Sequence, residues 1–274
     1  MVNWMKATLF YADILGFSAL AARPRARRAL EQLSDVAHLL STDDSLARYL
    51  QRPVWRARYG LSDSIFLLGA DPIEACASAA EFFFNLAFYN ATQSAPVLMR
   101  GAITFGEVRR TRAIFPETAR ANLVGEAVVR AVQLERSGAK GPRLLISAEV
   151  ARAMEKSKLN SLLDTTRDGA AELLWLLSPD VSLTDGLLIG DVVAAAVRLA
   201  LGAAHSREAV EHYIAYLDLC VRSLLRLKRY LPEAAEVALR KAALKKLRHR
   251  LDRVLDDLGD NGRATRQALE RLLE

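Results

Sequence analysis

The pattern of apolar and polar positions divides the chain into strand-like and helix-like segments. Six segments are predicted to be strands because they are apolar throughout or alternate with period two: 6–14, 54–61, 64–70, 97–108, 143–147 and 173–177. Helical spacing covers 16–40, 72–93, 125–138 and 148–154, and it resumes after Asp185. Pro72 stands at the first position of its helix, where proline is favoured, and Pro24 marks a kink or a restart.

The order of these elements favours one fold. Residues 6–108 run strand–helix–strand–strand–helix–strand, which is the ferredoxin-like arrangement of a split βαβ sheet with helices on one face. The fold class is therefore predicted as α+β, with a C-terminal helical extension. Because this fold serves many functions, the function has to be argued from specific sites.

Composition limits the setting of the protein. Of the 274 residues, 51% are hydrophobic and 26% charged, which is typical of a globular protein. Cys76 and Cys220 are far apart and make no disulfide framework. The N-terminus lacks a signal-peptide pattern, and Asp191 and Arg198 interrupt the most apolar stretch, 186–204. We expect a cytoplasmic protein with no membrane partner.

Positive charge is concentrated near the C-terminus. The net charge is +6, and residues 222–253 contain eleven Lys or Arg but only Glu233, Glu236 and Asp252 as acids. Such a helical surface can bind phosphates or anionic membranes, or it can simply be a solvated face.

Two aspartates stand where predicted strands end. Asp13 closes the strand 6–14, and Asp63 lies in the turn after the strand 54–61. These strands lie close together in a ferredoxin-like sheet, so both carboxylates reach one edge, where they would repel unless a cation lies between them. The turn at Gly16 leads into a helix whose first N–H groups suit a phosphate. Taken singly, Asp13 could be a helix N-cap and Asp63 a turn residue.

Five short motifs resemble the class III nucleotide cyclases, in the same order. They are ADILGFS, LSDSIFLL, RGAITFGEV, NLVGEAVVRAVQLE and LLISAEVARAM. The resemblance covers about residues 6–180 and implies a catalytic domain at 1–180, followed by a helical extension at 181–274. It departs from the family pattern at Ser62, which replaces a glycine. It departs again at Val129 and Gln133, which replace the ribose-orienting Asn and the transition-state Arg.

The resemblance implies a site with two divalent ions, Mn²⁺ or Mg²⁺. The implied metal ligands are the Asp13 and Asp63 carboxylates and the main-chain carbonyl of Ile14. Arg100 matches the arginine that binds the triphosphate, and a guanidinium suits phosphate oxygens. The triphosphate would also lie against the turn formed by Gly16, Phe17 and Ser18.

The substrate-reading positions differ from those of purine cyclases and look most like the pyrimidine cyclases of bacterial Pycsar antiphage systems. Tyr59 and Asn122 occupy the base-reading positions, and a bulky Tyr59 ring would narrow the pocket for a pyrimidine. Alternatively, Tyr59 is an ordinary strand aromatic. Arg130, next to Val129, could supply an anionic contact. The resemblance implies UTP or CTP as substrate, a cyclic nucleotide product, a homodimer with shared sites and a separate effector protein that responds to the product.

Three other interpretations remain open at this stage. The protein could be a purine cyclase, or a catalytically silent cyclase-like domain that only binds nucleotide. The third is a nucleic-acid binder that uses the basic face 222–253. RNA-binding sheets of this fold present stacking aromatics, and the sequence has no such cluster, so we expect no nucleic-acid partner.

Overall fold

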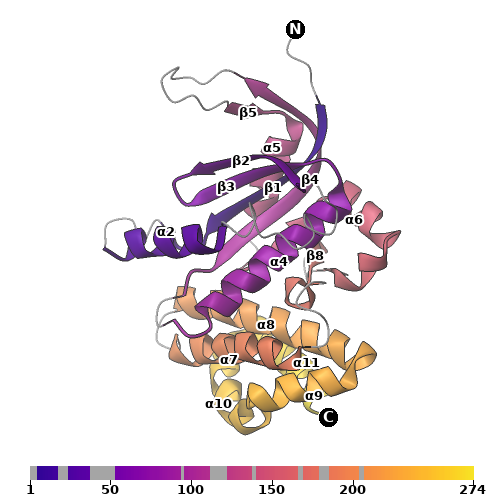
Figure 1. Ribbon diagram of the computed structural model, residues 1–274. Helices are drawn as coiled ribbons and strands as arrows, with labels where there is room; N and C mark the ends of the chain where they lie inside the picture. Colours follow the sequence, from indigo (N-terminus) through magenta and orange to yellow (C-terminus); the bar gives the residue numbers. More distant parts are fainter. Residues whose placement is uncertain are drawn as a thin grey trace.

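A mixed eight-stranded sheet occupies the N-terminal part of the protein (Figure 1). The computed structural model describes residues 5–17, 24–37, 53–93, 96–111, 122–137, 140–165, 169–178, 185–203 and 207–274. The strand order is β2-β3-β1-β4-β6-β8-β7, and β5 pairs with β4 off this path. The strands are β1 (Met5–Ile14), β2 (Trp55–Leu61), β3 (Ser64–Gly69), β4 (Met99–Thr111), β5 (Asn122–Val124), β6 (Leu144–Ile146), β7 (Leu163–Thr165) and β8 (Ala171–Leu173).

The first four strands confirm the predicted α+β, ferredoxin-like arrangement. Their spatial order β2-β3-β1-β4 places β1 between β3 and β4, with antiparallel pairing on both sides. The helices around the sheet are α2 (Pro24–Ala37), α4 (Pro72–Asn90), α5 (Glu126–Glu135) and α6 (Ala148–Glu155). Because β3 lies between β1 and β2, the strand that ends at Leu61 is close to β1 but not its direct neighbour.

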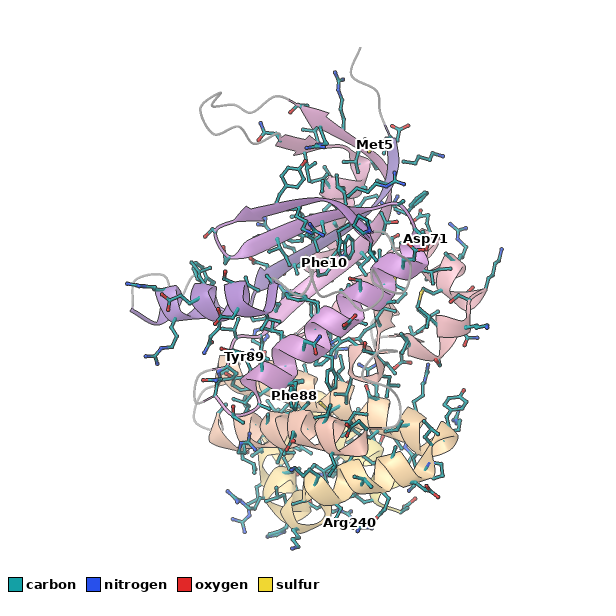
Figure 2. The ribbon with its side chains drawn as sticks, viewed as in Figure 1. Met5, Phe10, Asp71, Phe88, Tyr89 and Arg240 are labelled. Atoms are coloured by element: carbon teal, nitrogen blue, oxygen red, sulfur yellow. The ribbon has the colours of Figure 1, made fainter. Side chains whose placement is uncertain are left out.

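Helices cover both faces of the sheet, which corrects the expectation of one helical face. Side chains of β1 alternate, so Phe10 packs with α4 on one face (Figure 2) and Tyr11 belongs to a second cluster on the other face. That second cluster contains Ala127 and Ala131 of α5. Helix α5 therefore lies on the same face of the sheet as the odd-numbered positions of β1, which include Asp13.

The start of α4 shows why the sequence specifies it so well. Asp71 caps the helix, since its carboxylate accepts hydrogen bonds from the N–H groups of Ile73 (2.8 Å) and Glu74 (3.0 Å). Pro72 occupies the first turn, as predicted, and Figure 2 shows Asp71 at this end of the helix.

The segment 173–177 differs from its prediction as a strand. Strand β8 ends at Leu173, and a short 3-10 helix, η4 (Trp175–Leu177), follows. The indole N–H of Trp175 donates to the carbonyl of Pro142 at 2.7 Å, which fixes this buried turn against the neighbouring loop. An apolar run of this length does not by itself distinguish a strand from a buried turn. Strands β5 and β7, and the 3-10 helix η3 (Lys158–Leu162), were not predicted.

The C-terminal part is helical, as expected, and lies below the sheet in Figure 1. Its helices are α7 (Gly186–Gly202), α8 (Arg207–Tyr230), α9 (Pro232–Lys241), α10 (Leu244–Asp256) and α11 (Gly259–Leu273). Helix α7 packs against α4, and Tyr216 of α8 contacts Trp175 with ring centroids 5.9 Å apart. One continuous apolar core contains Phe10 near one end of the chain and Leu272 near the other.

Within the described residues, no helix is both long enough and apolar enough to cross a membrane.

Candidate active site

The two predicted aspartates lie together at one edge of the sheet. Asp13 is the penultimate residue of β1, and Asp63 lies in the tight turn between β2 and β3. The N–H of Ile14 donates to the main-chain carbonyl of Asp63 at 3.1 Å, which ties this turn to the end of β1. In the register of the sheet, Asp13 faces Ser64 on one side and Arg100 on the other.

The turn that carries Asp63 is conformationally strained. Ser62 adopts a φ of +56°, in the left-handed region that favours glycine. Only glycine reaches this conformation without a steric cost. The serine keeps the turn geometry at a cost in stability.

The surroundings of Asp13 disfavour its ionised form. Burial raises the pKa of Asp13, while the hydrogen bond from the Ser64 hydroxyl at 2.8 Å acts in the opposite direction. The negative charges of Asp63 and Glu135 raise the Asp13 pKa further. A cation between the carboxylates would reverse this repulsion.

A hydrogen-bonded chain leads from this carboxylate into the core. The Tyr11 hydroxyl lies 3.5 Å from the Ser64 hydroxyl, which in turn donates to Asp13. The Tyr11 ring packs on Phe66 with centroids 4.6 Å apart, so the chain rests on a rigid aromatic pair. Ser64 and Tyr11 were not predicted as site residues, although Ser64 stands in the motif LSDSIFLL and Tyr11 directly precedes ADILGFS.

The turn after Asp13 is described only in part. Gly16 has a φ of +71°, a conformation that L residues rarely adopt, and Phe17 packs against the core. The N–H of Leu15 donates to the carbonyl of Leu98 at 2.9 Å, which anchors the start of the turn. Ser18, the third residue predicted to contact phosphate, lies outside the described residues.

Arg100 lies beside Asp13 but is already engaged by a carboxylate. Its Nε donates to Oε1 of Glu135 at 2.6 Å, and a second guanidinium nitrogen contacts the same oxygen. The Glu135 side chain is 2% exposed, so this is a nearly buried ion pair. Sequence reasoning missed Glu135, whose only signal was an acidic residue at an inward position of the helix 125–138.

A second arginine stands close to this group. Arg136 follows Glu135 directly at the end of α5, its side chain is exposed, and it forms no ion pair with a carboxylate within the described residues. Burial raises the pKa of Tyr11, and the positive charge of Arg136 acts against that rise. Arg136 is therefore a cation near the Tyr11–Ser64–Asp13 chain that the sequence reasoning did not identify.

Tyr59 lies on the same face, one row further into the sheet. It pairs with Phe66 across β2 and β3 and packs at the edge of the α5-side cluster. Its hydroxyl is buried, with no hydrogen-bond partner in the described part of the chain. The guanidinium carbon of Arg110 lies 6.0 Å from the centre of its ring.

Asn122 lies far from the aspartates within one chain. It begins β5 and pairs with Thr111 at the last position of β4, whereas Asp13 pairs with Arg100 at the other end of that strand. Strand β4 has 13 residues, and at about 3.3 Å per residue its length is roughly 40 Å. Asn122 and Asp13 of the same chain therefore do not line one nucleotide-sized site.

Arg130 and its neighbours on α5 point in different directions. Arg130 is ion-paired with Glu149 of α6 and with Glu126 at 3.3 Å, and it lines a cavity of about 780 Å³ between α5 and α6. Val129 is 55% exposed, and Gln133 is also exposed. The structure therefore does not bring Arg130 together with Asp13 and Asp63.

The aspartate pair fits a hard divalent cation. Carboxylate and main-chain carbonyl oxygens are the ligands that Mg²⁺ and Mn²⁺ prefer, and Asp13, Asp63 and Ile14 offer both kinds. Burial, followed by the negative charges of Asp63 and Glu135, raises the pKa of Asp13, and a bound cation would favour its ionised form. Among the described residues, no cluster of three or more His, Cys, Asp or Glu is arranged to hold a metal ion.

Comparison with known proteins adds only weak similarities. No protein-family profile matches the sequence, and no curated protein matches it. Solved structures with partial similarity include the adenylyl cyclase CyaB from P. aeruginosa, at 14% identity over 63% of this chain and 95% of that chain, with a TM-score of 0.48. Another is the monomeric guanylyl cyclase domain of the RhoGC fusion protein from the aquatic fungus Blastocladiella emersonii, at 16% identity over 63% and 97%, with a TM-score of 0.49. At this level of similarity, the site has to be assigned from its own residues.

Proposed function

We propose that the protein is a metal-dependent nucleotide cyclase that converts a pyrimidine nucleoside triphosphate into its 3′,5′-cyclic monophosphate and pyrophosphate. The observation that carries the proposal is the pair Asp13 and Asp63 at one sheet edge, beside the glycine turn at Gly16. UTP is the first substrate to test and CTP the second. The motif resemblance supports the same reaction class.

Metal ions at this pair would supply the acidity of the ribose 3′-hydroxyl and charge neutralisation on the phosphates. The protein's own contribution is rigid placement. Asp13 is fixed by the sheet register and by the Ser64 hydroxyl, and Asp63 is fixed by the hydrogen bond between its carbonyl and Ile14. Holding the reacting oxygen in line with the α-phosphorus requires this kind of immobile frame.

The cationic side of the site would hold the triphosphate. In this proposal Arg100 faces the phosphates from a position fixed by Glu135, and Arg136 adds an exposed guanidinium next to it. When the 3′-oxygen attacks the α-phosphorus, the bond to pyrophosphate breaks and negative charge grows on the leaving group. Two arginines on that side would stabilise the charge as it develops.

Tyr59 would set the choice of base. Its ring lies in the same cross-strand row as Phe66 and Tyr11, and in this proposal it narrows the space on the α5 face for a base. The buried hydroxyl has no partner in the described residues and could hydrogen-bond a pyrimidine edge, which offsets the cost of its burial. A pyrimidine is smaller than a purine, so both features support UTP or CTP.

The separation between Asp13 and Asn122 supports a homodimer. If Asn122 contacts the base, it has to come from a second copy, and twofold symmetry then gives two equivalent sites. Val129 and Gln133 are exposed on α5, where a partner would cover them. In this proposal the cyclic product acts as a second messenger in antiphage defence through a separate effector protein.

A product assay over all four nucleoside triphosphates with Mn²⁺ tests the proposal. We expect cyclic UMP or cyclic CMP, and turnover of ATP or GTP alone would show that the Tyr59 argument fails. Asp63→Ala should abolish turnover and leave the fold intact, while Asp257→Ala, which removes an exposed aspartate at the end of α10, should change nothing. Metal-dependent nucleotide binding without any product would favour the silent-domain alternative.

A further inference from the structure

A separate pocket lies where α8 and α11 approach strand β7. Its volume is about 360 Å³, and no residue of the candidate active site lines it. Its charged lining residues are Asp164, Asp218, Arg222, Arg226, Arg229 and Arg271. Four arginines against two aspartates leave an excess of positive charge in a small space.

Arg222, one of the four arginines, forms ion pairs that hold the fold together. Arg222 donates to Glu172 at 2.7 Å and to Asp218 at 3.0 Å, and it also pairs with Asp164. Glu172 is fully buried, so the guanidinium compensates a charge that would otherwise be costly. Arg143 also pairs with Glu172 at 2.8 Å and lies 3.7 Å from Asp218. With Arg226 near Asp164, three guanidinium groups therefore face the three carboxylates.

The second arginine fixes the pocket wall. Arg226 donates to the main-chain carbonyls of Ser161 at 2.8 Å and Leu163 at 2.6 Å, and its other nitrogen lies 3.6 Å from Asp164. These contacts join helix α8 to the segment that leads into β7. The wall is therefore held in place before any ligand binds, which lowers the entropy lost on binding.

The remaining two arginines carry the uncompensated charge. Arg229 of α8 and Arg271 of α11 are exposed at the pocket, and no ion pair to either occurs within the described ranges. Arg271 donates to the carbonyl of Gln267 at 3.3 Å. Each lies in the last turn of its helix, where a cation also favours the helix dipole. The helix dipole accounts for a basic residue at the C-terminal end of each helix, but it does not account for Arg229 and Arg271 lining the same cavity.

The pocket also has an apolar side, made by Leu225, Ala264 and Ala268. An anion alone would gain nothing from that surface, whereas a ligand with an organic part would bury apolar area on it. We propose that this pocket binds a small organic phosphate, with the phosphate between Arg229 and Arg271 and the organic part against the apolar side. This inference does not depend on the proposed cyclase activity.

Calorimetric titration with ribose 5-phosphate in a metal-free buffer tests the inference on the full chain. This probe has a phosphate and a small organic part but no base, so it is a poor ligand for the candidate active site. The test variant is Arg229→Ala/Arg271→Ala, which removes only exposed side chains. The matched control is Arg240→Ala/Arg250→Ala, which removes two exposed arginines outside the pocket; Figure 2 labels Arg240 at the far end of the helical part.

We expect the test variant to bind ribose 5-phosphate roughly tenfold or more weakly than the unmodified protein, because two charge-assisted contacts are lost. The control should bind as the unmodified protein does. Equal weakening in both double variants, or no binding to the unmodified protein, would overturn the inference. Inorganic phosphate and sulfate binding as tightly as ribose 5-phosphate would also overturn it, since the pocket would then hold an adventitious ion only.

Discussion

The ion pair between Arg100 and Glu135 gives the sharpest prediction about the candidate site. Glu135→Gln keeps the shape of the side chain and removes its charge, which leaves the Arg100 guanidinium nearly buried without its carboxylate. The Glu135 side chain is 2% exposed and that of Arg100 is 19% exposed. Removing one partner of a buried pair costs about 3–5 kcal/mol. Because Arg100 keeps some contact with water, we expect the lower end, about 3 kcal/mol.

A second ion pair in the same part of the fold provides the control. Arg130 and Glu149 are 31% and 37% exposed, so Glu149→Gln should cost no more than about 1 kcal/mol. Urea denaturation of both variants measures the two losses directly. Equal losses would refute the argument that burial decides the strength of these pairs, as would a loss under about 1 kcal/mol for Glu135→Gln.

The same substitution has an electrostatic consequence at Asp13. The charge of Glu135 is one of the causes that raise the Asp13 pKa, so Glu135→Gln should lower that pKa. Proton titration of Asp13 by NMR checks the direction, and Glu149→Gln should leave the Asp13 resonance unchanged. An unchanged Asp13 pKa in Glu135→Gln would show that the two carboxylates do not interact.

Three further outcomes follow from the same structure. Ser62→Gly should stabilise the protein by about 0.5–1 kcal/mol in thermal denaturation, because relief of the left-handed conformation exceeds the entropy cost of glycine; a loss of stability would contradict the turn geometry. Gly125→Ala should destabilise the protein by more than about 3 kcal/mol. Gly125 has a φ of +140°, and a Cβ added there would lie 2.3 Å from the Glu107 carbonyl oxygen. The control Gly202→Ala should cause no such loss, because a Cβ at Gly202 meets open space. Asp13→Asn should raise stability at pH 7 without metal. Because the pKa of Asp13 is raised in the native state, the stability of the wild-type protein increases as the pH falls through that pKa. The stability advantage of Asp13→Asn should therefore disappear at low pH. An advantage that does not depend on pH would exclude this explanation.

The sequence by itself determined the helices and strands that are specified by patterns a few residues long. The sequence predicted the strand β1, the start of α4 at Asp71 and Pro72, and the ferredoxin-like arrangement of the first four strands. Side-chain alternation and helix capping can be recognised because they depend on residues that are close together in the chain. The conformation of the apolar run 173–177 could not be predicted, since the 3-10 turn there is held by a hydrogen bond from Trp175 to the distant Pro142 carbonyl.

Tertiary structure decided which charges meet. The sequence placed Asp13 and Asp63 at strand ends, but only the sheet register placed Ser64 and Arg100 on either side of Asp13. The pairing of Arg100 with Glu135 joins residues on different elements, and Arg222 likewise joins α8 to two strands. Ion pairing acts over a few ångströms of space regardless of separation along the chain, so hydrophobic periodicity carries no information about which partners will meet.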